Sequence, residues 1–513
     1  MSQRRRLSFV PLCWIFLLPM AALAAPNGGP LGAFQAHGDV GNPKLAGQAT
    51  WNAASQEYVV TAGGVNMWGP RDEFHMAWRK LEGDFILQAR VEFLGTGVDP
   101  HRKAGLIART SLDDDAAYVD GALHAGDGLT SLQFRRTKGA VTEQIEAPVK
   151  GADVIQLERR GDTYIFSAAR FGEPFVSREI GDLKLGSALY IGLFMCSHNG
   201  DVKETAVFRN VRVIRPAKPD FVPYRDYIGS VLELLHVDTG VRKVIHQSTT
   251  QPFEAPNWTP DGAALIYNTS GRTEGRGRLH RFDLATRQAA PIDTGFAIRN
   301  NNDHVLSFDG TMLGISDQST DQNQSTIFTL PVGGGTPKRI TPLTPSYLHG
   351  WSPDAKWLVY TGGRGGEFDI YRIPADGSGA EQRLTTAKGV DDGPEYSPDG
   401  KYIYFNSVRT GRMQIWRMKA DGSEQEQVTN DGYNDWFPHF SPDGKWIAII
   451  SYGDDIQPSD HPYYKHVYLR LMPIEGGTPK VIAYVYGGQG TINVPSWSPD
   501  GKMLAFVSNS DKL

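Results

Sequence analysis

The sequence of 513 residues predicts an all-β protein in which a β-sandwich is followed by a six-bladed β-propeller. Three observations lead to this prediction. Short turns of the Ser-Pro-Asp-Gly type recur at a regular spacing in the C-terminal part. The N-terminal part holds alternating apolar and polar runs separated by Gly, Asp and Asn. Between residues 31 and 213, no run has a helical period of useful length.

Six turns define the propeller. They begin at Thr259, Ser307, Ser352, Ser397, Ser441 and Ser498, with spacings of 48, 45, 45, 44 and 57 residues. Pro restricts φ and Asp-Gly tolerates a positive φ, so each copy predicts a tight turn between two strands. A period near 45 residues with four strands per unit is typical of a propeller blade. The residue before each turn is large and apolar, and we interpret these six as packing between blades: Trp258, Leu306, Trp351, Tyr396, Phe440 and Trp497.

The two ends of the propeller, residues 228–513, are expected to share one blade. The chain ends at Leu513, just after the second strand of the sixth unit, Met503 to Val507. The candidates for its two outer strands are Val231 to Val237 and Arg242 to His246, which precede the first turn. Pairing the two ends would remove the open edge of the ring. The sequence therefore predicts six blades closed by an N-terminal hairpin.

Residues 1–24 have the features of a secretory signal peptide. Arg4, Arg5 and Arg6 precede an apolar run, and Ala22-Leu23-Ala24 offers a cleavage site near Ala24. The apolar run is short and uneven, so no membrane span is expected. We expect a periplasmic or secreted protein, whose formal net charge changes from -5 to -8 when the three Arg residues are removed. An acidic excess without a basic tract argues against nucleic-acid binding.

Residues 31–213 are predicted to form the sandwich, because short alternating runs such as Phe85 to Phe93 recur there with turn signals between them. A linker, residues 214–227, follows. It contains three prolines, which stiffen the chain and cannot donate to a sheet: Pro216, Pro219 and Pro223. We therefore place the domain boundary in this linker and expect few contacts across it.

The repeats resemble the TolB-type propeller repeat. The SPDGK copies, the strands IYRIPADG and IWRMKADG, and the blade ends QRLT and EQVT carry this resemblance, which covers residues 231–513. The resemblance implies a TolB-like propeller. The type example is a periplasmic partner of outer-membrane lipoproteins, and similar propellers serve as oligogalacturonate lyases and as regulatory domains of serine peptidases. The type example carries an α/β domain ahead of its propeller, where this sequence predicts a β-sandwich.

Residues 31–213 resemble the laminin-G and concanavalin-like jelly-roll domains found beside bacterial sugar-active modules. GDF at Gly83 to Phe85, KAGLIAR at Lys103 to Arg109 and AVFRNVRV at Ala206 to Val213 carry this second resemblance. Four residues near turns of this part could bind a glycan, although the Trp is equally plausible as core: Trp68, His75, His124 and Asp127.

The candidate binding site lies on the inner strands, which line the central channel of a propeller and precede each turn in this repeat. Side chains two apart share a strand face, so the residues three and five positions before each turn should both face the channel. Polar groups near these positions would then converge at one mouth of the channel. The candidate ligand-binding residues, including two from later loops, are Glu254, Asn302, Asp303, His304, His349, Asp392, Glu395, Asp435, His439, His461, Gln489 and Asn493. The alternative is that these groups cap the inner strands and bond to neighbouring blades.

The fifth unit carries a long insertion, residues 452–466, which accounts for its 57-residue spacing. Its aromatic and acidic residues would suit a sugar-binding lid over the channel, and the alternative is a solvated loop.

Three histidines among the candidates, His304, His349 and His439, would suit a divalent metal such as Zn²⁺ or Mn²⁺. Two functions follow. The first is a non-catalytic exported protein that binds a glycan or a protein partner at the channel mouth. The second is a metal-assisted carbohydrate-active enzyme, a glycan lyase or glycoside hydrolase, with its site on the propeller axis. A peptidase is not expected, because the sequence has no Gly-x-Ser-x-Gly motif.

Overall fold

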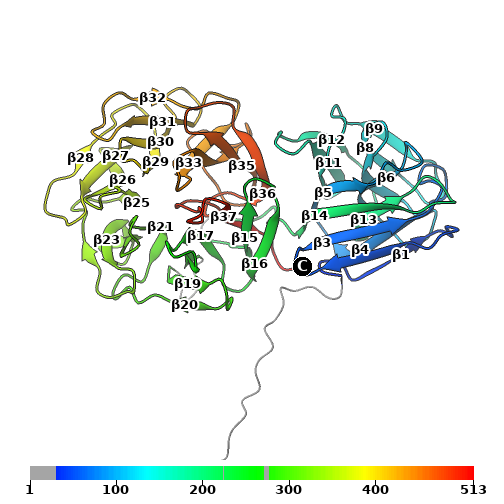
Figure 1. Ribbon diagram of the computed structural model, residues 1–513, viewed down its shortest axis with the longest axis horizontal. Coiled ribbons are helices and arrows are strands. Elements are labelled where there is room, and N and C mark those ends of the chain that lie inside the picture. The colour runs from blue at the N-terminus through cyan, green and yellow to red at the C-terminus, as the bar shows by residue number, and fades with distance from the viewer. Residues whose placement is uncertain (1–30, 223–224, 271–276) are drawn as a thin grey trace, which may run out of the picture.

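A computed structural model describes residues 31–222, 225–270 and 277–513, and nearly all of their regular structure is β-strand. The exception in these ranges is a three-residue 3-10 helix, η1 (Asp321–Asn323). Figure 1 shows two bodies, a pair of sheets formed by the earlier part of the chain and a propeller formed by the later part. The predicted signal peptide lies outside the described residues. Within the described ranges, no helix has the length and apolar character needed to cross a membrane.

Residues 36–214 form two seven-stranded antiparallel sheets. The first sheet contains, in spatial order, β1 (Ala36–Val40), β4 (Phe74–Glu82), β13 (Ala188–Cys196), β6 (Lys103–Arg109), β7 (Tyr118–His124), β8 (Thr130–Arg135) and β9 (Glu143–Glu146). The second contains β12 (Val176–Ile180), β11 (Thr163–Ala169), β10 (Val154–Arg160), β5 (Phe85–Leu94), β14 (Glu204–Ile214), β3 (Glu57–Ala62) and β2 (Gln48–Asn52). One apolar core joins the two sheets: Leu87 and Leu157 of the second pack with Leu106 and Leu193 of the first, all fully buried. Burying each such Leu stabilises the fold by about 2 kcal/mol.

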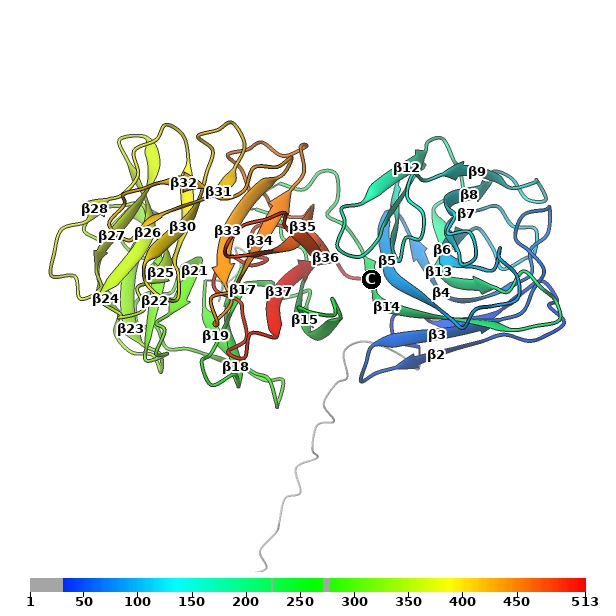
Figure 2. The same ribbon diagram turned by 45° about the horizontal axis from the view of Figure 1, so that its top comes forward.

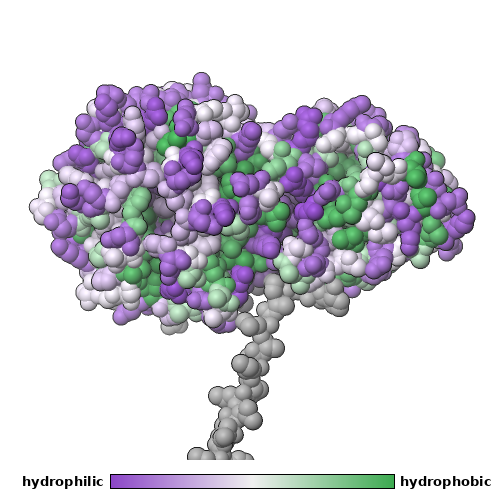
Figure 3. All heavy atoms as spheres, viewed as in Figure 1, coloured by the Kyte–Doolittle hydropathy of each residue, from purple (hydrophilic) through white to green (hydrophobic). Residues whose placement is uncertain are grey.

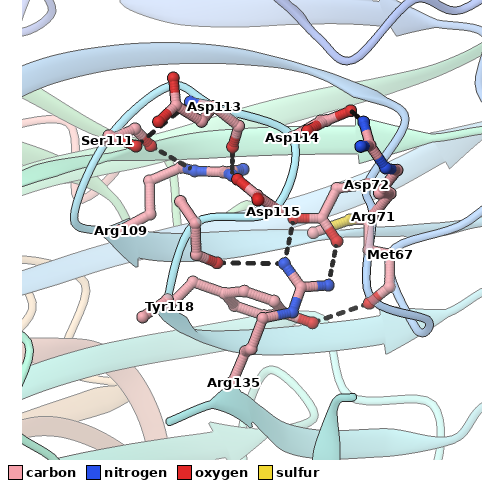
Figure 4. A network of polar contacts seen from close by, with 12 residues as sticks. Met67, Arg71, Asp72, Arg109, Ser111, Asp113, Asp114, Asp115, Tyr118 and Arg135 are labelled. Carbon is pink, nitrogen blue, oxygen red and sulfur yellow. Dashed lines mark hydrogen bonds and ion pairs between the residues drawn. The ribbon is translucent and has the colours of Figure 1, made fainter. Parts of the chain in front are cut away.

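A buried ionic network ties the loops beside the first sheet to its strands. The Asp72 carboxylate accepts two hydrogen bonds from Arg135, at 2.6 and 2.9 Å, and Arg109 lies 3.4 Å away. Figure 4 shows the Arg135 guanidinium beside the ring of Tyr118, whose hydroxyl donates to the Met67 carbonyl at 2.7 Å. Burial raises the pKa of Asp72, and the two guanidinium groups oppose this shift. The network leaves no charge of this set unpaired.

The propeller contains six sheets. Five are four-stranded, and their strands run from the centre outward as β17 (Phe253–Trp258), β18 (Ala264–Thr269), β19 (Leu279–Asp283) and β20 (Ala289–Pro291); β21 (Asn300–Leu306), β22 (Met312–Asp317), β23 (Thr326–Pro331) and β24 (Lys338–Arg339); β25 (Ser346–Trp351), β26 (Trp357–Arg364), β27 (Glu367–Pro374) and β28 (Gln382–Arg383); β29 (Asp391–Tyr396), β30 (Tyr402–Ser407), β31 (Gln414–Lys419) and β32 (Glu426–Gln427); β33 (Asn434–Phe440), β34 (Trp446–Tyr452), β35 (Lys465–Pro473) and β36 (Lys480–Gly487). The predicted number of blades, six, is confirmed.

The sixth sheet combines strands from the two ends of the propeller. β37 (Met503–Asn509) pairs antiparallel with β15 (Ser230–His236), and β15 pairs with β16 (Arg242–Ser248). On the inner side, Trp497 forms an isolated bridge with Leu504. Strands more than 260 residues apart in the chain therefore lie in one sheet, as the neighbouring green and red arrows in Figure 1 show.

The repeated turn has one hydrogen-bond pattern in all six copies. In the fifth copy the Ser441 hydroxyl donates to Asp443 at 2.6 Å and accepts from the backbone amide of Trp446 at 3.0 Å. Gly444 follows with φ of +67°, which Gly adopts without steric cost. The Ser and Asp side chains thus close the turn, and the Gly reverses the chain into the next strand.

The large residue before each turn is buried, as predicted. Two of these residues also bond to the preceding blade. Trp351 donates its indole N–H to the Val305 carbonyl, and Trp497 donates to the His439 carbonyl, each at 3.0 Å. These side chains therefore pack and bond between blades.

The two bodies are extensively bonded, so the expectation of few contacts across the linker is wrong. Arg242 of β16 donates to Gln88 of β5 at 3.0 Å and to Glu233 of β15 at 2.7 Å. Glu233 also accepts from Arg212 of β14 at 2.5 Å. Burial alone would raise the pKa of Glu233, but the two guanidinium groups lower it to about 2.

An apolar contact supports these ion pairs. Val154 and Ala169 of the second sheet pack against Val481 and Tyr484 of β36. Figure 2 shows β15 and β36 on the side of the propeller that faces β5 and β14, and the two bodies touch along this boundary in Figure 3. The prolines stiffen the linker, but they do not prevent the last blade from packing on the sheet.

Candidate functional site

The centre of the propeller holds a cavity of about 920 Å³, at the end where the inner strands begin. Every blade contributes to its wall. The contributing residue lies five positions before the turn in each case: Glu254, Asn302, Tyr347, Asp392, Trp436 and Asn493. This single offset brings a ring of polar and aromatic side chains together from residues that are far apart in the chain.

The offset of three behaves differently, because the inner strands are bulged. In five blades the pairing register shifts between Glu254 and Asn257, Asn300 and His304, Leu348 and Gly350, Asp392 and Glu395, and Trp436 and His439. A bulge adds a residue, so side chains before and after it no longer alternate in step. Of the six described residues at the offset of three, His349 alone lines the cavity. The prediction that both offsets face the channel is therefore wrong for the offset of three.

The structure brings together eight of the twelve predicted ligand-binding residues. Those that line the cavity are Glu254, Asn302, Asp303, His349, Asp392, His461, Gln489 and Asn493. Four are buried away from its wall: His304, Glu395, Asp435 and His439. Ligand binding by the eight stays a prediction.

Those four residues bond within the protein. His304 places Nε2 3.2 Å from the Ile266 carbonyl. The two ring nitrogens of His439 contact the Glu395 carboxylate and the Ile492 carbonyl. This pattern fits the alternative in which such groups cap strands and join blades.

The same bonds bear on the predicted metal ligands. Because His304 and His439 use ring nitrogens for protein carbonyls or a carboxylate, they do not converge with His349 on one point. In the described part of the chain, the one group of three His, Cys, Asp or Glu side chains close enough to share an ion lies in the sandwich and includes none of these histidines.

Asp392 is the centre of the polar side of the cavity. Its carboxylate accepts a hydrogen bond from the Thr361 hydroxyl at 2.6 Å and lies 3.3 Å from Nε2 of His349. Nε2 of His461 is 3.9 Å from its other oxygen. Burial opposes ionisation of Asp392, but the contacts with His349 lower its pKa to about 2. Burial also opposes the charged form of His349, yet Asp392 and Asp303 outweigh it and raise the pKa of His349.

Aromatic rings surround the same histidines. The His349 ring stacks on Phe437, with centroids 5.7 Å apart. The His461 ring meets the Trp436 ring edge-on at 4.4 Å. The cavity therefore offers apolar ring faces beside hydrogen-bonding groups.

Two other carboxyl groups in the cavity hold their protons more tightly. Burial raises the pKa of Glu254 to about 7 and that of Asp303 to about 6. Glu254 accepts from Asn268 at 3.1 Å and from the Tyr463 hydroxyl at 3.3 Å. Three carboxyl groups in one cavity thus have well-separated pKa values, an arrangement typical of acid–base sites.

Several cavity residues have side-chain atoms that are buried without a hydrogen-bond partner in the described structure: Asn268 Oδ1, Asn300 Oδ1, Asn302 Nδ2, His461 Nδ1 and Gln489 Oε1. Buried polar atoms in proteins are usually paired with protein or water. Both donors and acceptors are present in this set, so the cavity wall has unused capacity for a polar ligand.

The insertion of the fifth unit, residues 452–466, contributes one part of itself to the cavity. Ser459, His461 and Tyr463 line the wall, and Tyr464 packs away from it against Phe221 and Ile228. At the other end of the insertion, Asp454 is exposed and pairs with Arg412. The insertion therefore covers part of the cavity, as the lid interpretation requires, while its acidic end is solvated.

Sequence reasoning missed a neighbouring polar stretch. Arg299, Asn300 and Asn301 line the cavity beside Asn302, together with Gln318 from the following loop. The signal was present as the run RNNND, residues 299–303, at the start of β21. The repeat offsets alone could not identify it because other blades have no matching run.

Comparison with known proteins places the propeller in a family. The model of the TolB beta propeller domain matches residues 345–461. An uncharacterized protein of Agrobacterium fabrum (strain C58) is 47% identical over 279 residues, which is 54% of this chain and 92% of that protein.

Solved structures agree with this placement. A structure solved as a candidate TolB from Agrobacterium tumefaciens has 45% identity and a TM-score of 0.52, and the match covers 56% of this chain and all of that one. TolB from Acinetobacter baumannii has 16% identity and a TM-score of 0.40, over 65% of this chain and 79% of that one. The ring of six blades, the shared turn chemistry and the relative matched over nearly its full length together show that this chain belongs to the TolB-type β-propeller family.

Proposed function

We propose that this chain is an exported binding protein that holds a carbohydrate in the cavity of its propeller. The observation that carries the proposal is the set of buried, unpaired amide and imidazole atoms in a cavity that also presents the aromatic side chains of Trp436 and Tyr347. Hydroxyl groups both donate and accept, so a sugar matches a wall with unused donors and acceptors. A cavity of about 920 Å³ is large enough for a small oligosaccharide.

The charges of the wall favour a neutral glycan. Its carboxyl groups are those of Glu254, Asp303 and Asp392, and among the described lining residues Arg299 is the single Arg or Lys. An acidic glycan would face these carboxylates with little compensating positive charge. A uronate polymer is accordingly a poorer match than a neutral sugar.

The remaining parts of the chain have supporting roles in this proposal. Export rests on the predicted signal peptide in residues 1–24. The first two sheets are proposed to act as a concanavalin- or laminin-G-like sandwich that holds the rest of the polymer, and the β15–β16 hairpin is proposed to close the ring. A protein partner in place of the glycan is an outcome of the test below.

Binding of neutral oligosaccharides, screened on a glycan array and quantified by calorimetry, tests the proposal. His349 lines the cavity and His304 occupies the equivalent position of the adjacent blade without lining it. We therefore expect His349→Ala and Asn302→Ala to weaken binding at least tenfold. The matched control His304→Ala should bind normally and melt at a lower temperature. Equal binding by all variants, or binding to proteins but to no glycan, would contradict the assignment.

A second candidate is catalysis on the bound glycan, and one observation favours it. Asp392 is held ionised with a pKa of about 2, while Asp303 keeps its proton up to about pH 6. Such a pair supplies a base and an acid in one site. Since the three predicted metal ligands do not converge, acid–base chemistry is the basis of this candidate. Turnover of a bound glycan that disappears in Asp303→Asn would support it, and binding without turnover would leave the binding function alone.

A further inference from the structure

A cluster of imidazole and carboxylate groups lies far from the propeller cavity, at one end of the first sheet. It contains His101, His124 and Asp127, whose potential ligand atoms all lie within 4.8 Å of one another. The chain brings them together because Lys103, at the start of β6, pairs directly with His124, at the end of β7. The loop before β6 and the turn after β7 therefore meet at the same edge.

His124 provides an independent observation that points to a ligand. Its side chain is 7% exposed, and in the described structure neither of its ring nitrogens has a hydrogen-bond partner. A buried imidazole normally has at least one partner. The two exposed members of the cluster, His101 and Asp127, lie on its solvent side, so its open face is directed at the loops.

The electrostatic surroundings favour a neutral imidazole. Burial, assisted by the ammonium group of Lys103, lowers the pKa of His124 to about 4. At neutral pH the ring therefore keeps a lone pair that can coordinate a metal. The positive charge of Lys103 opposes a cation here, whereas Asp127 and Asp99 attract one.

A third histidine lies beside the cluster. The His198 ring centroid is 5.5 Å from that of His101, and its Nδ1 is 3.6 Å from Asp99 Oδ1. A carboxylate beside one ring nitrogen is a common way of orienting a metal-binding imidazole. His198 also has φ of +60°, a conformation that is costly for a side chain of this kind and so is held by its surroundings.

We propose that His101, His124 and Asp127 bind one divalent transition-metal ion, Zn²⁺ by preference, beside His198. Two imidazoles and one carboxylate are typical zinc ligands, and zinc sites accept three protein ligands with the fourth position open. Calcium and magnesium prefer a shell made of oxygen atoms, which this cluster does not supply. Bound metal would join the loop before β6 to the turn after β7.

Zinc titration of untagged full-length protein, in competition with a chromophoric chelator, tests this site. We expect one zinc ion per chain. His101→Ala and Asp127→Ala, which alter exposed side chains, should each weaken binding by at least tenfold. His37→Ala is the matched control, because His37 is another exposed histidine of the same sheet and contacts His75. It should bind zinc like the wild type.

Cobalt substitution and thermal denaturation complete the test. Co²⁺ should give the intense visible absorption of a four-coordinate site, and zinc should raise the melting temperature of the wild type but not that of His101→Ala. Equal zinc affinity in His101→Ala and His37→Ala would overturn the proposal. Zinc binding that is lost in the propeller variant His349→Ala, or binding of Ca²⁺ in preference to Zn²⁺, would overturn it as well.

Discussion

Single residues of the repeated turn show how its chemistry limits substitution. Five turns end in Gly with a positive φ, but the third ends in Ala355 with φ of +57°. This conformation costs an L-residue about 1–2 kcal/mol, and part of that gain is offset because Gly makes the unfolded chain more flexible. We expect Ala355→Gly to raise the free energy of unfolding by about 1 kcal/mol in urea denaturation. Ala448→Gly, inside β34, is the control and should lower it; a loss of stability in both variants would contradict the strain argument.

Glu254 links stability to pH within the cavity. Its pKa is about 7 in the folded protein and 4.5 as the model value. A raised carboxyl pKa means that the protonated form is favoured by folding, so this contribution is complete below about pH 4.5 and is lost as the pH rises through 7. The shift corresponds to about 3 kcal/mol. We expect the melting temperature of Glu254→Gln, relative to the wild type, to increase between pH 4.5 and 8.

Asp392→Asn is the companion control, because the pKa of Asp392 is lowered to about 2. Its contribution is present above pH 4 and is lost only as the pH falls through 2, so its difference from the wild type should be constant between pH 5 and 8. A constant difference for Glu254→Gln over the same range would contradict the raised pKa.

Among the structural elements, the hairpin β15–β16 has the strongest predicted effect. β15 pairs with β37 over seven residues and buries Leu232 and Leu235. Deleting residues 228–247 would expose the edge of β37 and remove both outer strands of that sheet. We expect the propeller to unfold or aggregate, as measured by circular dichroism and light scattering. A deleted protein that melts like the wild type would show that the sheet does not depend on the hairpin.

The contact between the two bodies makes a prediction about the molecule as a unit. Arg242 and Arg212 surround the buried carboxylate of Glu233, and Arg242 also bonds to the first body through Gln88. Removing one partner from a buried ion pair costs about 3–5 kcal/mol, because a charge is left without compensation. We expect Arg242→Ala to lower the melting temperature strongly at pH 7 and less near pH 3, where the stranded Glu233 can take up a proton. Arg281→Ala, at an exposed pair, is the control and should have little effect.

The sequence alone predicts the elements that depend on local chemistry. The Ser-Pro-Asp-Gly turns, their period and the apolar residue before each turn predict a six-bladed propeller, because turn conformation and burial are encoded within a few neighbouring residues. The offset of five also predicts a ring of cavity residues, including Glu254, Asp392 and Asn493, since every inner strand begins in the same way.

Tertiary structure decided the features that depend on register and on distant neighbours. The bulges in the inner strands turn His304 and His439 away from the cavity and leave His349 in it, and a one-residue change in register cannot be read from the repeat. The partners of Glu233 and the closeness of His101 to Asp127 likewise depend on how strands from separate parts of the chain pack. Short-range signals determine which segments are strands and turns, whereas the packing of those strands determines which polar side chains meet.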